Sequence, residues 1–152
     1  MKLSILSLII AAYAAILSTL NYYAQRRDKQ SRVTVTVKAG IMGIAPGVAS
    51  DACIFLEANN PAHKAVVVTV QGFILPDGRD MFFPYPQSNV TFPFKLEPES
   101  QCMVWMDMKK LGRQLRSEGY GGVVKIVGFY NDAVGRRHKS KPYKIDIGVW
   151  GR

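Results

Sequence analysis

The chain has 152 residues, and 20 Lys and Arg residues against 11 Asp and Glu residues give it a net charge of +9. Hydrophobic residues make up 48% of it, which excludes an intrinsically disordered protein, because such chains lack the apolar mass for a core. Two cysteines exclude a disulfide-dense scaffold.

Residues 1–24 are predicted to form a transmembrane anchor helix. No charge occurs between Lys2 and Arg26, and the 23 positions 3–25 would make a helix of about 34 Å, against roughly 30 Å for a bilayer core. Leu and Ile fill nine of the eighteen positions 3–20. The run is apolar on every side, unlike a surface helix of a soluble domain.

A cleaved signal peptide is the alternative, although the apolar run exceeds the roughly 7–15 residues usual for one. Residues 25–32 follow as a basic linker with four Lys or Arg and one Asp. Because an excess of Lys and Arg favours the cytoplasmic side, the C-terminal domain is predicted to be cytoplasmic, with a periplasmic or extracellular location as the alternative.

Residues 33–152 have the pattern of short β-strands. Apolar and polar residues alternate at the start, and valine-rich runs bounded by Asn, Pro and Gly follow. Residues 40–50, rich in Gly, Pro and Ala, predict a loop. The predicted strands are 33–38, 52–59, 65–75, 79–83, 90–96, 101–106, 123–130 and 143–150.

One short helix is predicted at 107–118. Asp107 can cap its first amides, three apolar residues share one face, and Gly119 supplies a left-handed stop. Seven to eight strands with one late helix resemble, in layout, an immunoglobulin-like antiparallel β-sandwich, so the predicted fold class is all-β. Tyr120 is a candidate for the corner tyrosine of that fold.

The sequence contains no recognisable catalytic, cofactor or metal motif. His63 and His138 are predicted to be solvated loop residues, and Cys53 and Cys102 lack the close spacing of zinc ligands. We therefore expect no enzyme activity, no cofactor and no small-molecule substrate. An enzyme with a site built from ordinary residues is a further alternative.

The two cysteines lie on strands predicted to be neighbours. Free thiols are expected in the cytoplasm. The alternative function, an exported binding or structural protein with a cleaved signal peptide, would carry a Cys53–Cys102 disulfide worth about 3–4 kcal/mol.

Positive charge concentrates between Lys109 and Lys144, where ten Lys and Arg face two acidic residues. Beside a membrane, such a basic hairpin can meet anionic lipid headgroups at about 1 kcal/mol per cation. The alternative is a solvated edge that resists strand pairing. Nucleic acid is not expected, because no stacking aromatics interleave the cluster. The predicted anionic-surface contacts are Arg136, Arg137, Lys139, Lys141 and Lys144.

Aromatic and valine-rich segments predict a second contact surface, for an unknown protein partner or a homo-oligomer. Its candidate residues are Phe82, Phe83 and Tyr85, with core packing as the alternative. Strands 65–75 and 123–130 are apolar on both faces, so one face of each needs cover. In the first of them, Val66, Val68 and Val70 are predicted to point inward and Val67 outward.

Together these features predict a single-pass, signal-anchored membrane protein whose β-sandwich acts as an interaction module without catalysis. The predicted partners are the lipid bilayer and a protein.

Overall fold

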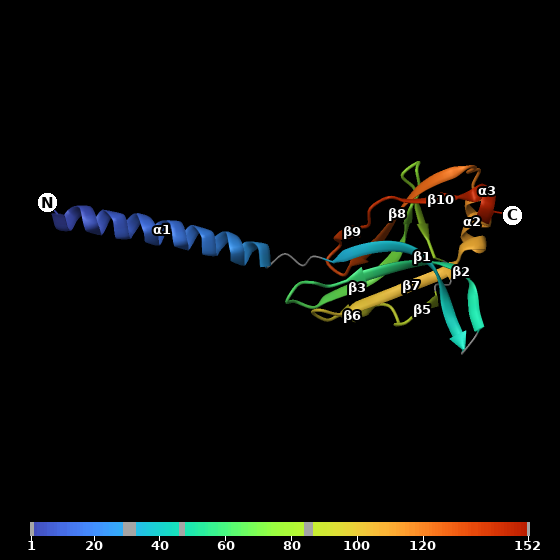
Figure 1. The fold of residues 1–152 in the computed structure, drawn as a ribbon, viewed down its shortest axis with the longest axis horizontal. Helices are drawn as coiled ribbons and strands as arrows, with labels where there is room; N and C mark the ends of the chain where they lie inside the picture. Colours follow the sequence, from blue (N-terminus) through green and yellow to red (C-terminus); the bar gives the residue numbers. More distant parts are fainter. Residues whose placement is uncertain (1, 29–32, 46–47, 84–86, 152) are drawn as a thin grey trace.

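The computed structural model describes residues 2–28, 33–45, 48–83 and 87–151, and two antiparallel sheets dominate it (Figure 1). The strands in these ranges are β1 (Thr34–Ala45), β2 (Val48–Asn59), β3 (Val66–Ile74), β4 (Asp80–Phe82), β5 (Gln87–Ser88), β6 (Phe94–Leu96), β7 (Gln101–Asp107), β8 (Val123–Asp132), β9 (Arg137–Lys139) and β10 (Tyr143–Asp146). The helices are α1 (Lys2–Asp28), α2 (Met108–Ser117) and α3 (Ile147–Trp150).

The strands form a four-stranded and a six-stranded sheet. The first has the order β1-β2-β7-β5, and the second has the order β10-β8-β3-β4, with β6 paired to β3 and β9 paired to β8. The predicted all-β, sandwich-like character is therefore confirmed.

The core lies between the two sheets, where alternate side chains of each strand point inward. Ile54 and Leu56 of β2 are fully buried, as are Phe73 of β3 and Ile126 of β8. A hydrogen bond joins the two sheets at this point: the Tyr130 hydroxyl of β8 donates to the Leu56 carbonyl of β2 at 2.7 Å. The sheets approach each other closely at Gly128, where a Cβ would overlap the side chains of Leu56 and Val37.

The prediction of a loop at 40–50 is wrong for the described part of that segment. β1 continues to Ala45 and β2 begins at Val48, so the two strands form one long hairpin. The pairing of these strands shifts register twice, once before and once after Gly43. Glycines that predict a loop are also the residues that strands use at bulges.

Two predicted strands are shorter in the structure. In 90–96, only Phe94–Leu96 is a strand. The segment 143–150 changes to helix α3 after Asp146, whose carboxylate accepts the N–H of Gly148 at 2.8 Å and caps the helix. A capping Asp inside an apolar run was the sequence signal for this change.

The predicted helix at 107–118 is confirmed as α2. The Asp107 carboxylate accepts the N–H groups of Lys109 and Lys110 at 2.7 and 3.0 Å. Gly119, with a φ of +89°, lies just beyond the helix as predicted.

Helix α1 lies apart from the sheets in Figure 1. All of its described side chains, residues 7–23, are exposed. A transmembrane helix is not shown: within the described part of the chain, no helix is long and apolar enough to cross a membrane.

Replacing Gly128 with Ala is expected to destabilise the domain by about 1–3 kcal/mol, because the added methyl overpacks the space between the sheets. Gly121→Ala is the matched control, since a Cβ there meets nothing within 4 Å. Urea unfolding of the full chain measures both variants. Equal free energies of unfolding for the two would contradict the tight contact at Gly128.

Candidate functional site

The predicted basic hairpin is present and is formed by β8 and β9. Asn131 pairs with Arg137, and Phe129 pairs with Lys139. Because alternate residues point to opposite faces, Phe129, Asn131 and Arg137 share the outer face of the six-stranded sheet. Lys139 lies at the end of β9, an edge strand, where it borders the first residues of β1.

Asp132 holds the turn of this hairpin from the buried side. One carboxylate oxygen accepts the N–H groups of Val134 at 3.1 Å and Arg136 at 2.8 Å, and the other lies 3.2 Å from His138 Nε2. The His138 side chain is only 11% exposed, so the prediction of a solvated loop residue is wrong: its strand position turns it toward the Asp132 carboxylate. His63 is exposed, as predicted.

Arg137 is fixed on the outer face by three neighbours. Its guanidinium donates to both carboxylate oxygens of Asp80, at 2.9 and 2.8 Å, and its Nε donates to Asn131 Oδ1 at 3.1 Å. It also lies 4.3 Å from the centroid of the Phe129 ring. These contacts occupy three of its five N–H donors. Arg137 is therefore held in place by its neighbours and is less available to bind an external anion than an unpaired cation would be.

The other four predicted cations are exposed. Lys139 and Lys141 lie beside the first residues of β1, with which they line a groove. Lys144 lies on β10, directly opposite Lys125 of β8. The sequence-based site left out Lys125, although its alternation with the buried residues Val124 and Ile126 marks it as outward-facing.

The basic hairpin lies at the end of the sandwich where the chain arrives from α1. Val33 is the first described residue after that helix, and it lines the same groove as residues 138–143. Figure 1 shows β9 beside the start of β1. The start of β1 and the basic hairpin are therefore neighbours.

The three predicted partner contacts have different positions. Phe82 is 51% exposed and stacks edge-on against Phe129, with ring centroids 5.9 Å apart. Phe83 is buried against Phe73 at 5.1 Å, so it is a core residue and its assignment to a contact surface is wrong. Tyr85 lies outside the described residues.

Exposed valines add apolar area elsewhere on the six-stranded sheet. Val67 is exposed, as predicted, and so is Val123. Val70 is also exposed, and its predicted inward orientation is wrong, because a register shift between Val68 and Val70 reverses the alternation.

Cys53 and Cys102 are both free and buried, as predicted. They lie on neighbouring strands, but Cys53 pairs with Asp107 and Cys102 with Ala58, five positions along. Five positions along a strand separate the two Cα atoms by about 17 Å, whereas a disulfide needs Cα atoms about 4.4–6.8 Å apart. The Cys53–Cys102 disulfide of the alternative is therefore incompatible with this fold. Burial raises the pKa of the Cys102 thiol to about 11, which keeps it protonated at neutral pH.

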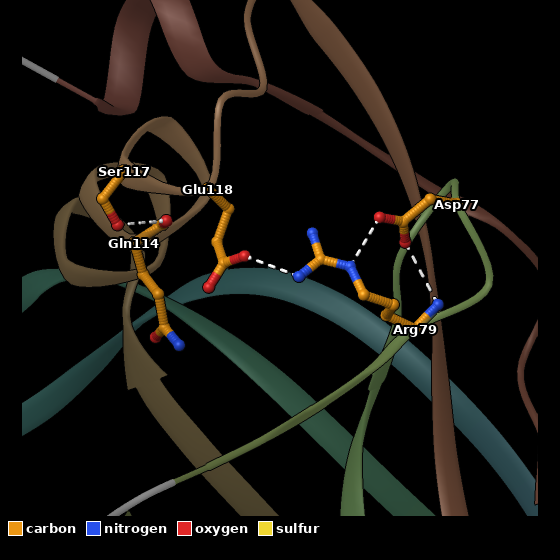
Figure 2. A network of polar contacts seen from close by, with 5 residues as sticks. All are labelled: Asp77, Arg79, Gln114, Ser117 and Glu118. Atoms are coloured by element: carbon orange, nitrogen blue, oxygen red, sulfur yellow. Dashed lines mark hydrogen bonds and ion pairs between the residues drawn. The ribbon is translucent and has the colours of Figure 1, made fainter.

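Figure 2 shows Arg79 between two carboxylates at the far end of the sheets. Its Nε donates to Asp77 at 2.7 Å, and another guanidinium nitrogen donates to Glu118 at 2.9 Å. These bonds join the β3–β4 turn to the end of α2. Tyr120 lies near Asp77 and Arg79. Among the described residues its hydroxyl has no hydrogen-bond partner, so it does not make the backbone bond of a corner tyrosine.

Potential metal ligands are not clustered among the residues that the structure describes. Within those ranges, no three His, Cys, Asp or Glu side chains are grouped to hold a metal ion. Asp77 and Asp80, which flank the β3–β4 turn, are each paired with an arginine. The lack of enzyme activity stays a prediction.

Comparison of the chain with models of known protein families and with curated proteins finds no match.

The carboxyl of Asp77 is expected to titrate with a pKa of about 2, because the Tyr120 hydroxyl and then Arg79 stabilise its charged form. A lowered pKa contributes stability above the ordinary value of 3.8, and this is lost as the pH falls toward 2. Tyr120→Phe and Arg79→Gln should each raise this pKa, and Glu118→Gln is the control. Carbon-13 NMR of the carboxyl group measures it, and an ordinary pKa in the unmodified chain would contradict the assigned contacts.

Proposed function

We propose that the chain is a single-pass, membrane-anchored interaction module without catalytic activity, with its sandwich on the cytoplasmic side. The observation that carries the proposal is the exposed, uncharged surface of α1. Its described side chains, residues 7–23, are exposed on every side and contain no Asp, Glu, Lys or Arg. A protein partner would cover one stripe of such a helix, whereas lipid covers all of it.

The sequence around these residues extends the apolar run. Positions 3–25 carry no charge, and Lys2 and Arg26 bound them. Basic residues at both ends of an apolar segment can reach the headgroups on each side of a bilayer. The basic linker then leads to β1, so the basic hairpin beside β1 would face anionic lipid headgroups.

An immunoglobulin-like topology is part of the proposal. If the strands other than the short β6 and β9 are lettered along the chain as A, B, C, C′, D, E, F and G, the four-stranded sheet β1-β2-β7-β5 has the order ABED. The other sheet, β10-β8-β3-β4, has the order GFCC′. Both orders are those of immunoglobulin-like sandwiches. This fold serves many functions and does not by itself select one.

The anchor is tested by alkaline carbonate extraction of membranes from cells that express the full chain. The unmodified chain should stay in the membrane pellet with its N-terminus intact. Ala14→Arg should release much of it, because an arginine near the centre of the run opposes insertion by about 2.5–3.5 kcal/mol. Ala133→Arg, at an exposed turn, is the matched control and should stay in the pellet.

A soluble mature chain that begins near Gln25 would instead support the exported alternative. The side of the membrane is read from Ser117→Cys with an impermeant maleimide. Cys53 and Cys102 are buried and give little background. Labelling only after the cells are opened supports a cytoplasmic sandwich, and labelling of intact cells contradicts it.

We also infer that the outer face of the six-stranded sheet binds a second copy of the chain. Phe82 and Arg137, which are held in place against the buried Phe129 ring, form a preorganised aromatic and cationic surface, of the kind that dominates interface energies. Confinement of anchored copies to one membrane would raise their effective concentration.

Phe82→Ser is therefore expected to weaken self-association about 10-fold or more. Ile41→Ser is the control, because Ile41 is 67% exposed on the β1–β2 hairpin, away from this face. Sedimentation of the full chain in detergent measures both variants. If the unmodified chain is monomeric even at a high ratio of protein to detergent, this inference is wrong.

A further inference from the structure

A groove runs between the two sheets at the end of the sandwich nearest α1. Residues 33–37 of β1 form one wall, and side chains between 138 and 143 form the other. Its volume is about 710 Å³, within the range of small-molecule sites. β1 is an edge strand of its sheet, so this side of the sandwich is open.

The groove is cationic and has no acidic lining residue among those described. Lys139 and Lys141 are exposed on its wall. The nearby carboxylates are already engaged: Asp132 binds the turn and His138, and Glu57 pairs with Lys38 at 2.7 Å. An anion in the groove would therefore meet two lysines that no neighbouring carboxylate neutralises.

The remaining lining is suited to an amphiphile. Val33 and Val35 present largely buried side chains at its floor, and Pro142 and Tyr143 add apolar surface. Thr34 and Thr36 supply hydroxyl groups along the rim. A ligand with a charged head and a short apolar stem matches this combination better than inorganic phosphate does.

Chain length keeps the groove near α1. Four residues lie between Asp28, the last residue of that helix, and Val33, which makes five Cα–Cα steps. They span at most about 18 Å when fully extended. If α1 is embedded in a bilayer, as proposed above, the groove lies within reach of the lipid headgroups.

We propose that this groove binds the headgroup of one anionic phospholipid, with its phosphate oxygens accepting hydrogen bonds from the ammonium groups of Lys139 and Lys141. The glycerol and the first acyl carbons then lie against Val33, Val35 and Tyr143. This proposal rests on the membrane-anchored function, and it replaces a diffuse charge contact with a defined site. Arg137 takes no part, because Asp80 and Phe129 hold it on the outer face.

The test is an NMR titration of the full ¹⁵N-labelled chain in micelles of dodecyl maltoside. The titrant is dihexanoyl phosphatidylglycerol, which reaches the groove from solution. Saturable shifts are expected for the backbone amides of residues 33–37 and 138–143. Dihexanoyl phosphatidylcholine, inorganic phosphate and a hexaglutamate peptide are titrated in parallel.

The double variant Lys139→Gln and Lys141→Gln should raise the Kd for phosphatidylglycerol about 10-fold or more, because it removes two cations near the ligand. The matched control removes two lysines from α2, Lys109→Gln with Lys110→Gln, and should change the Kd less than about twofold. Unchanged amide shifts outside the groove verify that each variant is folded.

Four results would overturn the proposal. They are equal shifts with phosphatidylcholine, equal affinity for inorganic phosphate, tighter binding of hexaglutamate along β1, and an unaltered Kd in the double variant. The titration does not depend on α1 crossing a bilayer, so its failure leaves the anchor standing. Failure of the carbonate experiment alone removes the anchor and leaves the groove as an anionic-lipid site.

Discussion

At the middle of β8 the two sheets are held at a separation that only a glycine permits. Leu56 and Val37 occupy the space that a Cβ on Gly128 would need. Two residues further on, the Tyr130 hydroxyl bonds to the Leu56 carbonyl, and burial raises the pKa of Tyr130 so that it remains a donor. This contact positions β8, and through β8 it positions β9 and the groove.

The outer face of the same strand is organised by packing of a different kind. Phe129 has no exposed surface although it points away from the core, because Phe82 and Arg137 cover it. Arg137 in turn is oriented by Asp80. The charge of Arg137 alone suggested that it binds an external anion. In the structure its guanidinium covers the Phe129 ring instead.

Alternation of apolar and polar residues predicted most strands, and the Asp107 cap with Gly119 predicted α2, because these signals are local in the chain. The errors arise where the pairing between strands decides the outcome. Val70 is reversed by a bulge in its pairing with β8, His138 is buried by Asp132, and the glycines of 40–50 are used in a hairpin. Of the predicted site, the exposed lysines and Phe82 are where the sequence placed them. The groove escaped detection because its walls are more than 100 residues apart in the chain.

Lys125 and Lys144 face each other across β8 and β10, and like charges in direct opposition weaken a strand pair. Their repulsion is tolerable in a folded sandwich, since both ammonium groups reach water. A further strand laid against β10 would bring its own side chains alongside this doubled charge. The β10 edge of the six-stranded sheet therefore resists the addition of another strand.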